Sequence, residues 1–230
     1  MNDMTKYYSA GTGYSMSNQA KIDSRIPNLV SSLRDNVPPG SRVLDLGCGD
    51  MYLKELCPEY EWVGVDINVK RGDIVNHDLA SFPYPFPTNH FDAAVCSEVL
   101  EHVWSPPKVL SELNRVLRRK GTLVVTVPNM DNMDNLLSHH QVLLYNPDNE
   151  HSVEHIRQYN LQSIRHLVEK AGFGVLDCFG NSPYLSKWIQ WARAELLKAS
   201  PGKTQIEVDV VLGRMFPDVC PGIGIVAKSK

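Results

Sequence analysis

The sequence lacks both an excess of basic residues and a long apolar run. Its 230 residues include 23 Lys and Arg against 26 Asp and Glu, so the formal net charge is −3. Such a chain has no basic field to attract a polyanion, and we expect no nucleic-acid partner. No apolar run approaches the roughly 18 residues that span a membrane, and the N-terminal residues do not resemble a signal peptide. We therefore expect a cytoplasmic protein without stable membrane insertion.

Cysteine is scarce, and its spacing argues against a disulfide framework or a zinc finger. The five cysteines (48, 57, 96, 178 and 220) include no close pair, as expected of core thiols in a reducing compartment. One stretch, His151-Ser152-Val153-Glu154-His155, has the spacing of a zinc-peptidase motif. That motif requires a long helix, whereas the preceding Asn146-Pro147-Asp148-Asn149 is rich in turn formers. We therefore predict no metal site.

The residues that are present fit one α/β domain, because 43% of them are hydrophobic and can fill a full-sized core. Helical spacing of apolar residues occurs around 22–33, 50–57, 109–117 and 161–168. Seven short apolar runs predict strands at Arg42–Leu46, Trp62–Asp66, Asp73–Val75, Phe91–Ser97, Thr122–Pro128, Phe173–Phe179 and Gly222–Lys228. This alternation predicts a doubly wound, seven-stranded, mostly parallel sheet.

The most informative segment is an apolar run that ends in an acid and a Gly-x-Gly turn. Val43–Leu46 leads into Gly47-Cys48-Gly49, and a second apolar run ends at Asp66. This pattern is typical of a β-α-β nucleoside-binding unit, in which glycines let a ligand approach the backbone. The acid after the second strand can accept hydrogen bonds from ribose hydroxyls, and its spacing from Gly49 is close to the roughly 20 residues expected.

The same turn argues against a ligand with phosphates. A dinucleotide motif requires a third glycine where this chain has Tyr52. Asp50 also places a negative charge at the start of the following helix, where a phosphate would be repelled. Asp45 adds a second carboxylate, so the pocket suits a ribose and a cationic group, as in S-adenosylmethionine. A nicotinamide-dependent reductase is the less favoured interpretation.

Several segments, in the same order along the chain, resemble one enzyme family. Asp45–Gly49 resembles the first signature of class I S-adenosylmethionine-dependent methyltransferases, and His77-Asp78-Leu79 resembles their segment beside the adenine. Phe91–His102 is similar to the fourth-strand signature of the small-molecule branch, which includes quinone and sugar methyltransferases. The likeness covers roughly residues 38–179 and departs at Met51, where the family often has glycine.

The resemblance implies a Rossmann-like methyltransferase fold with S-adenosyl-L-methionine as cofactor. The residues that it assigns to cofactor binding are Asp45, Gly47, Cys48, Gly49, Asp66, Ile67, Asp78, Leu79, Ser97 and Glu98. We expect one domain overall, with an N-terminal segment and helix at 1–40 covering the cofactor and the methyltransferase domain at 41–230.

The acceptor residues are expected in the loops that follow the fourth and fifth strands, where ligands of this architecture bind. Residues 129–160 are rich in histidine and are expected to form a substrate lid. We name His155 and His102 as candidate catalytic residues. The alternatives are an ordinary helix-start hydrogen bond for His155 and a packing or helix-dipole role for His102.

These observations predict an enzyme that transfers a methyl group to oxygen or nitrogen of a small-molecule acceptor. The alternative is a non-catalytic S-adenosylmethionine-binding domain that serves as a regulatory or interaction subunit. Trp188 and Trp191 are expected to share a face of a further helix. That face would pack on the domain, contact a second subunit in a homodimer, or dock a lipophilic acceptor or a membrane surface.

Overall fold

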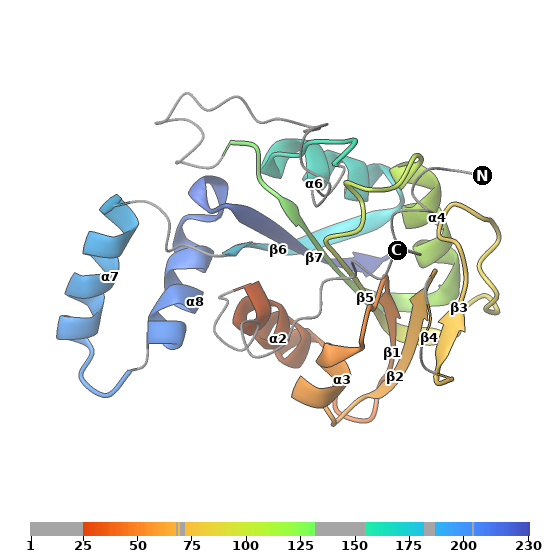
Figure 1. Ribbon diagram of the computed structural model, residues 1–230, viewed down its shortest axis with the longest axis horizontal. Helices are drawn as coiled ribbons and strands as arrows, with labels where there is room; N and C mark the ends of the chain where they lie inside the picture. Colours follow the sequence, from red (N-terminus) through yellow and green to blue (C-terminus); the bar gives the residue numbers. More distant parts are fainter. Residues whose placement is uncertain (1–24, 68, 70–71, 132–154, 182–186, 204) are drawn as a thin grey trace.

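The chain folds around a seven-stranded sheet with the strand order β3-β2-β1-β4-β5-β7-β6 (Figure 1). This computed structural model describes residues 25–67, 69, 72–131, 155–181, 187–203 and 205–230. The strands are β1 Arg42–Leu46, β2 Glu61–Asp66, β3 Ile74–Asn76, β4 Phe91–Ser97, β5 Leu117–Pro128, β6 Phe173–Asn181 and β7 Gly222–Ser229. β7 is antiparallel to β5 and β6, and the other pairs are parallel. The predicted seven-stranded, mostly parallel sheet is confirmed.

Helices cover both faces of the sheet, because alternate residues of its central strands point to opposite sides. Leu44 of β1 and Ala94 of β4 pack with the apolar residues of α4 and α6. Val43 and Ala93 pack instead with those of α2 and α3. These helices are α2 Arg25–Asn36, α3 Tyr52–Leu56, α4 Pro106–Val116 and α6 Leu161–Lys170.

β5 begins earlier than the sequence predicts. The sequence predicts a strand from Thr122, but the strand begins at Leu117, which pairs with Phe91 of β4. The register shifts between Phe91 and Ala93, and Lys120 has a φ of 63°. The residues just before Thr122 therefore form an irregular part of the strand.

Two further helices, α7 Lys187–Ala199 and α8 Gln205–Met215, lie at one end of the sheet, with α7 outermost (Figure 1). α8 contacts α7, β6 and α2, and a 3-10 helix, η2 Pro217–Val219, follows it. Arg193 of α7 and Asp209 of α8 form a largely buried ion pair at 2.6 Å. Trp191 is 61% exposed, while the side chain of Trp188 lies outside the described residues. None of the helices in the described part of the chain is long and apolar enough to cross a membrane.

Candidate cofactor and acceptor site

The predicted site residues gather where the carboxyl ends of the central parallel strands meet. β1 lies between β2 and β4, so the chain leaves β1 towards one neighbour and later returns on its other side. Such a switch in strand order opens a crevice at the carboxyl edge of the sheet, where ligands bind. Asp66 is the last residue of β2 and Ser97 the last of β4. Asp45 is the penultimate residue of β1.

The glycine turn after β1 has the conformation that the sequence pattern predicts. Gly47 and Gly49 have φ angles of 72° and 51°, in the left-handed region that favours glycine. A Cβ at Gly47 would lie 2.6 Å from Cγ2 of Val99, whereas a Cβ at Gly49 would meet nothing within 4 Å. The backbone of Gly49 is therefore open to a ligand.

Met51 takes the left-handed conformation that a glycine would adopt at this position, with a φ of 57°. Its buried side chain packs with Cys48 and Ile74. A Cβ at Gly64 of β2 would lie 2.7 Å from Sγ of Cys48 and 2.8 Å from Sδ of Met51, so the absence of a side chain there makes room for both. Cys48 thus turns its thiol into the core.

Asp66 ties the glycine turn to β2. Its Oδ2 accepts a hydrogen bond from the Gly49 N–H at 2.9 Å, and its Oδ1 accepts one from the Ile67 N–H at 2.7 Å. Each carboxylate oxygen can accept more than one hydrogen bond, so these contacts are compatible with additional ribose hydroxyls.

Asp45 is buried without a full set of partners. It is only 3% exposed, and its Oδ2 has no hydrogen-bond partner among the described residues. Burial and the nearby negative charge of Asp66 raise the pKa of Asp45 to about 7. A cationic group placed beside Asp45 would offset both effects. These residues therefore fit a ligand that combines a ribose with an ammonium group, as S-adenosylmethionine does.

The other residues assigned to the cofactor flank this turn. The side chain of Leu79 lies close to Gly47, and Asp78 accepts a hydrogen bond from the Ala80 N–H at 2.8 Å. Ser97 ends β4, Glu98 follows it, and Thr126 of β5 holds both side chains. The Ser97 and Thr126 hydroxyl oxygens are 2.8 Å apart, and Thr126 donates to Oε1 of Glu98 at 2.9 Å.

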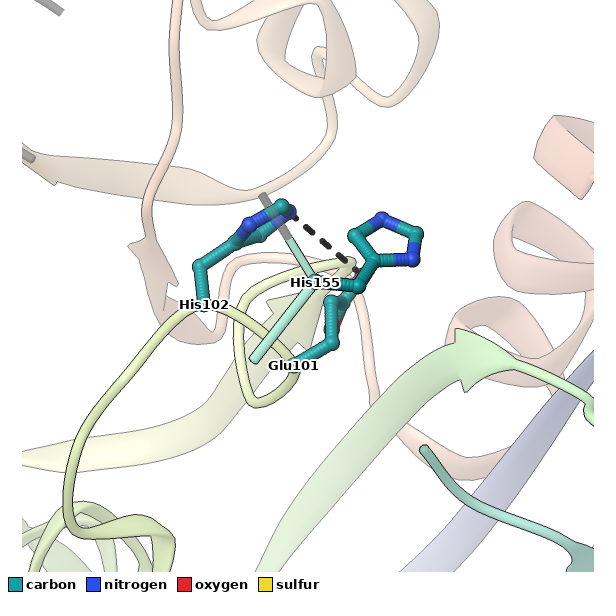
Figure 2. Close-up of side chains that lie close together, drawn as sticks. All are labelled: Glu101, His102 and His155. Atoms are coloured by element: carbon teal, nitrogen blue, oxygen red, sulfur yellow. Dashed lines mark ion pairs between the residues drawn. The ribbon is translucent and has the colours of Figure 1, made fainter. Parts of the chain in front are cut away.

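The two candidate catalytic histidines, 53 residues apart in the chain, lie side by side just after β4. The ring centroids of His102 and His155 are 4.9 Å apart, and Figure 2 shows both rings beside Glu101. Glu101 is 1% exposed, and neither of its carboxylate oxygens has a hydrogen-bond partner among the described residues. Burial, together with the charge of Glu98, raises the pKa of Glu101 well above its usual range. Burial lowers the pKa of His155.

Residues 155–160, called the His155 segment below, are held by hydrogen bonds against the ends of β4 and β5. The Ile156 N–H donates to the Glu101 carbonyl at 3.0 Å, and the Met130 N–H donates to the Tyr159 carbonyl at 2.8 Å. The Tyr159 hydroxyl donates to the Leu100 carbonyl at 3.2 Å. The rest of the predicted lid, including His139, His140 and His151, lies outside the described residues, as do residues 1–24 of the predicted cofactor cover.

The sequence analysis did not name Glu101 as a candidate site residue. Its position shortly after a buried strand and next to His102 could have indicated it. The segment that carries His155 reaches Glu101 through the hydrogen bond from the Ile156 N–H to the Glu101 carbonyl, a tertiary contact that local sequence does not reveal.

The methyltransferase domain family matches residues 19–177 of this chain. The chain belongs to this family. A relative from Mycolicibacterium smegmatis, named a probable S-adenosylmethionine-dependent methyltransferase, is 29% identical over 155 residues, which are 61% of this chain and 55% of the relative. The demethylmenaquinone methyltransferase of Symbiobacterium thermophilum is 30% identical over 105 residues, covering 37% of this chain and 42% of that protein. The chain thus spans about half the length of these curated relatives. As a member of the S-adenosylmethionine-dependent methyltransferases, it has S-adenosyl-L-methionine as its cofactor.

Solved structures of methyltransferases share its fold. A S-adenosylmethionine-dependent methyltransferase from Archaeoglobus fulgidus aligns with a TM-score of 0.56 at 21% identity, covering 87% of this chain and 93% of that one. A methyltransferase from Haloferax volcanii, in complex with the Trm112 activator, aligns with a TM-score of 0.62 at 19% identity, covering 100% and 98%. At these identities the likeness establishes the fold alone, and this is the Rossmann-like methyltransferase fold that the sequence predicted.

Proposed function

We propose that this methyltransferase transfers a methyl group from S-adenosylmethionine to oxygen or nitrogen of a small-molecule acceptor. The observation that carries the proposal is the buried Asp45 carboxylate beside the glycine turn and Asp66, since this set calls for a cationic nucleoside. The similarity to a demethylmenaquinone methyltransferase and the net charge of −3 support a small molecule over a nucleic acid.

When bound, S-adenosylmethionine supplies a methyl group on a sulfonium, which is already a good leaving group. The task of the protein is therefore mainly positioning, which can contribute about 7–11 kcal/mol. A general base adds about 10²–10⁴-fold, or roughly 3–5 kcal/mol, and only where the acceptor must lose a proton. Asp66 and the Gly47–Gly49 turn are proposed to hold the ribose side, and Asp45 the ammonium. His102 and His155 are proposed to face the acceptor.

The second candidate is a non-catalytic S-adenosylmethionine-binding subunit. One solved structure that resembles this chain is a methyltransferase in complex with the Trm112 activator, so dependence on a protein partner is worth testing. The retained Asp45, Gly47, Gly49 and Asp66 favour an enzyme, since a subunit that only binds partners need not keep them.

We further propose that the protein acts in the cytoplasm, because its five cysteines are all free and so suit a reducing compartment. The exposed Trp191 of α7 is the proposed contact of a homodimer.

The decisive experiment combines calorimetry with a panel screen. Calorimetry should show binding of S-adenosylmethionine, and incubation with quinols, sugars, carboxylates and amines should release S-adenosylhomocysteine with at least one of them. Binding without release across the panel would favour the subunit interpretation. Binding of NADH in place of S-adenosylmethionine would refute both.

A further inference from the structure

We propose that Glu101, His102 and His155 bind a divalent transition-metal ion on the acceptor side of the site. One ligand atom from each of these residues lies within 4.8 Å of the others. Two imidazoles and a carboxylate form a donor set that suits zinc and other first-row transition metals. The sequence offered no metal spacing, because His155 comes from a segment far from Glu101 and His102 in the chain. The zinc-peptidase pattern shares only His155 with this cluster.

The condition of Glu101 is the main argument for a cation. Its carboxyl group is 1% exposed and lacks a hydrogen bond to any described residue, although buried polar groups are nearly always hydrogen-bonded. The His102 imidazole approaches it with 3.8 Å between Nε2 and Oε1, which is beyond hydrogen-bond range. Glu98, which is close enough to act on Glu101 electrostatically, adds negative charge. A bound cation would satisfy both carboxylate oxygens and offset this charge.

The geometry requires only side-chain movement. Metal–nitrogen and metal–oxygen distances of about 2.0–2.2 Å place neighbouring ligand atoms of a tetrahedral site roughly 3.3–3.5 Å apart. Oε1 of Glu101 and Nε2 of His102 are already 3.8 Å apart, and Figure 2 shows both histidine rings beside Glu101. The hydrogen bond from the Ile156 N–H to the Glu101 carbonyl fixes the two backbone segments relative to one another.

A site with three protein ligands leaves at least one coordination position open, as in catalytic zinc centres. In the proposed function, this position would receive an oxygen of the acceptor. Only this last step rests on the proposed function, since the metal site itself stands on the three side chains.

The test is to strip the full chain of metal with a chelator, titrate it with Zn²⁺ and measure the binding by calorimetry. We expect one equivalent to bind. Glu101→Gln and His155→Ala should each weaken binding by more than about 100-fold, because loss of an outer-shell partner alone commonly costs about 10–100-fold. His166→Ala, which removes an exposed histidine of α6 outside the cluster, should leave the affinity unchanged.

Glu101→Gln is the sharper variant, because an amide resembles a protonated carboxyl in shape and should preserve the fold. Zn²⁺ binding that survives Glu101→Gln, including binding at a cysteine, would overturn the metal site. Failure of the wild-type chain to bind Zn²⁺ would also overturn it. S-adenosylmethionine binding, measured on the same samples, tests the proposed function separately, because the proposed ribose and ammonium contacts, Asp66 and Asp45, belong to β2 and β1.

Discussion

At the scale of single residues, the proposed cofactor end of the site contains two carboxylates that differ in their hydrogen bonding. Asp66 is hydrogen-bonded to the backbone of Gly49 and Ile67, whereas Asp45 is buried with one oxygen unsatisfied. The first is arranged to fix a turn and still accept hydrogen bonds from a ligand. The second favours a positive charge beside it. Each therefore predicts a different response to substitution.

Asp66→Ala should weaken S-adenosylmethionine binding by roughly ten- to a hundredfold. The substitution removes charge-assisted hydrogen bonds that contribute about 1.5–3 kcal/mol, and about 1.4 kcal/mol corresponds to tenfold. Isothermal titration calorimetry measures the change. Asp73→Asn, which alters an exposed ion pair with Lys54, is the matched control and should bind normally. Unchanged affinity in a folded Asp66→Ala protein would remove Asp66 from the cofactor site.

Asp45 should make the ligand-free protein less stable as the pH rises. Its pKa is raised from 3.8 to about 7, so the folded protein holds this proton more tightly than the unfolded chain. The contribution of Asp45 to the free energy of unfolding therefore falls as the pH rises from about 4 to about 7, by on the order of 4 kcal/mol. Above this range the contribution no longer changes with pH. Asp45→Asn should lack this fall, because the amide does not ionise.

Urea denaturation of wild type and Asp45→Asn at several pH values between about 4 and 8 tests this dependence. The difference in stability between the two proteins should grow with pH in favour of the variant. Saturating S-adenosylmethionine should reduce that growth, because its ammonium favours the ionised carboxylate. Stability curves that run parallel for the two proteins would show that Asp45 has an ordinary pKa.

At the scale of elements, α6 follows the segment that carries His155 and joins it to the sheet. Asn160 caps this helix, accepting a hydrogen bond from the Ser163 N–H at 2.9 Å, and its Nδ2 donates to Oδ2 of Asp131 at 2.8 Å. Ser163 accepts in return from the Asn160 N–H at 3.0 Å, which completes a capping box. The helix start is thus joined to the residues that follow β5.

Asn160→Ala should lower the free energy of unfolding by about 1 kcal/mol, within a usual range of about 0.5–2 for loss of an N-cap. Asn160→Ser keeps a good capping oxygen but cannot reach Asp131 in the same way, so it should lose less. Chemical denaturation of the three proteins gives the comparison. Equal losses for the two variants would assign the effect to the Asp131 contact and not to the cap.

The elements of the sheet were predictable because their signals are local. β1 and β4 have the predicted bounds, since short apolar runs that end in turn residues or acids mark buried parallel strands. α8 was not predicted. Its Ile206, Val208, Val210 and Val211 are β-branched residues that favour strands, and Gly213 interrupts the helical pattern. Gly213 is needed because a Cβ there would collide with the Gly180 carbonyl of β6, a tertiary contact that local sequence does not reveal.

At the scale of the whole molecule, the site combines residues that the fold brings together from distant parts of the chain. The sequence could place Asp45, the glycine turn and Asp66 together, because they lie in one β-α-β unit. On the proposed acceptor side, the sequence indicated His102 and His155 only as separate residues. Their approach to one another and to the buried Glu101 depends on how the segment after residue 155 returns to β4. Spacing along the chain carries no information on that return.

The cofactor should stabilise the whole domain, because it binds the folded chain and not the unfolded one. At a concentration of 100 times its Kd, a ligand adds about 2.7 kcal/mol to the free energy of unfolding. For a domain of this size, about 1 kcal/mol shifts Tm by roughly 2–4 °C, so S-adenosylmethionine should raise Tm by about 5–10 °C. Differential scanning fluorimetry measures this shift.

At the same ligand concentration Asp66→Ala should show about half the stabilisation or less, because a tenfold weaker Kd leaves about 1.4 kcal/mol. NADH should give no shift, and a shift with NADH alone would indicate that the β1 turn accepts a dinucleotide despite Tyr52 and Asp50.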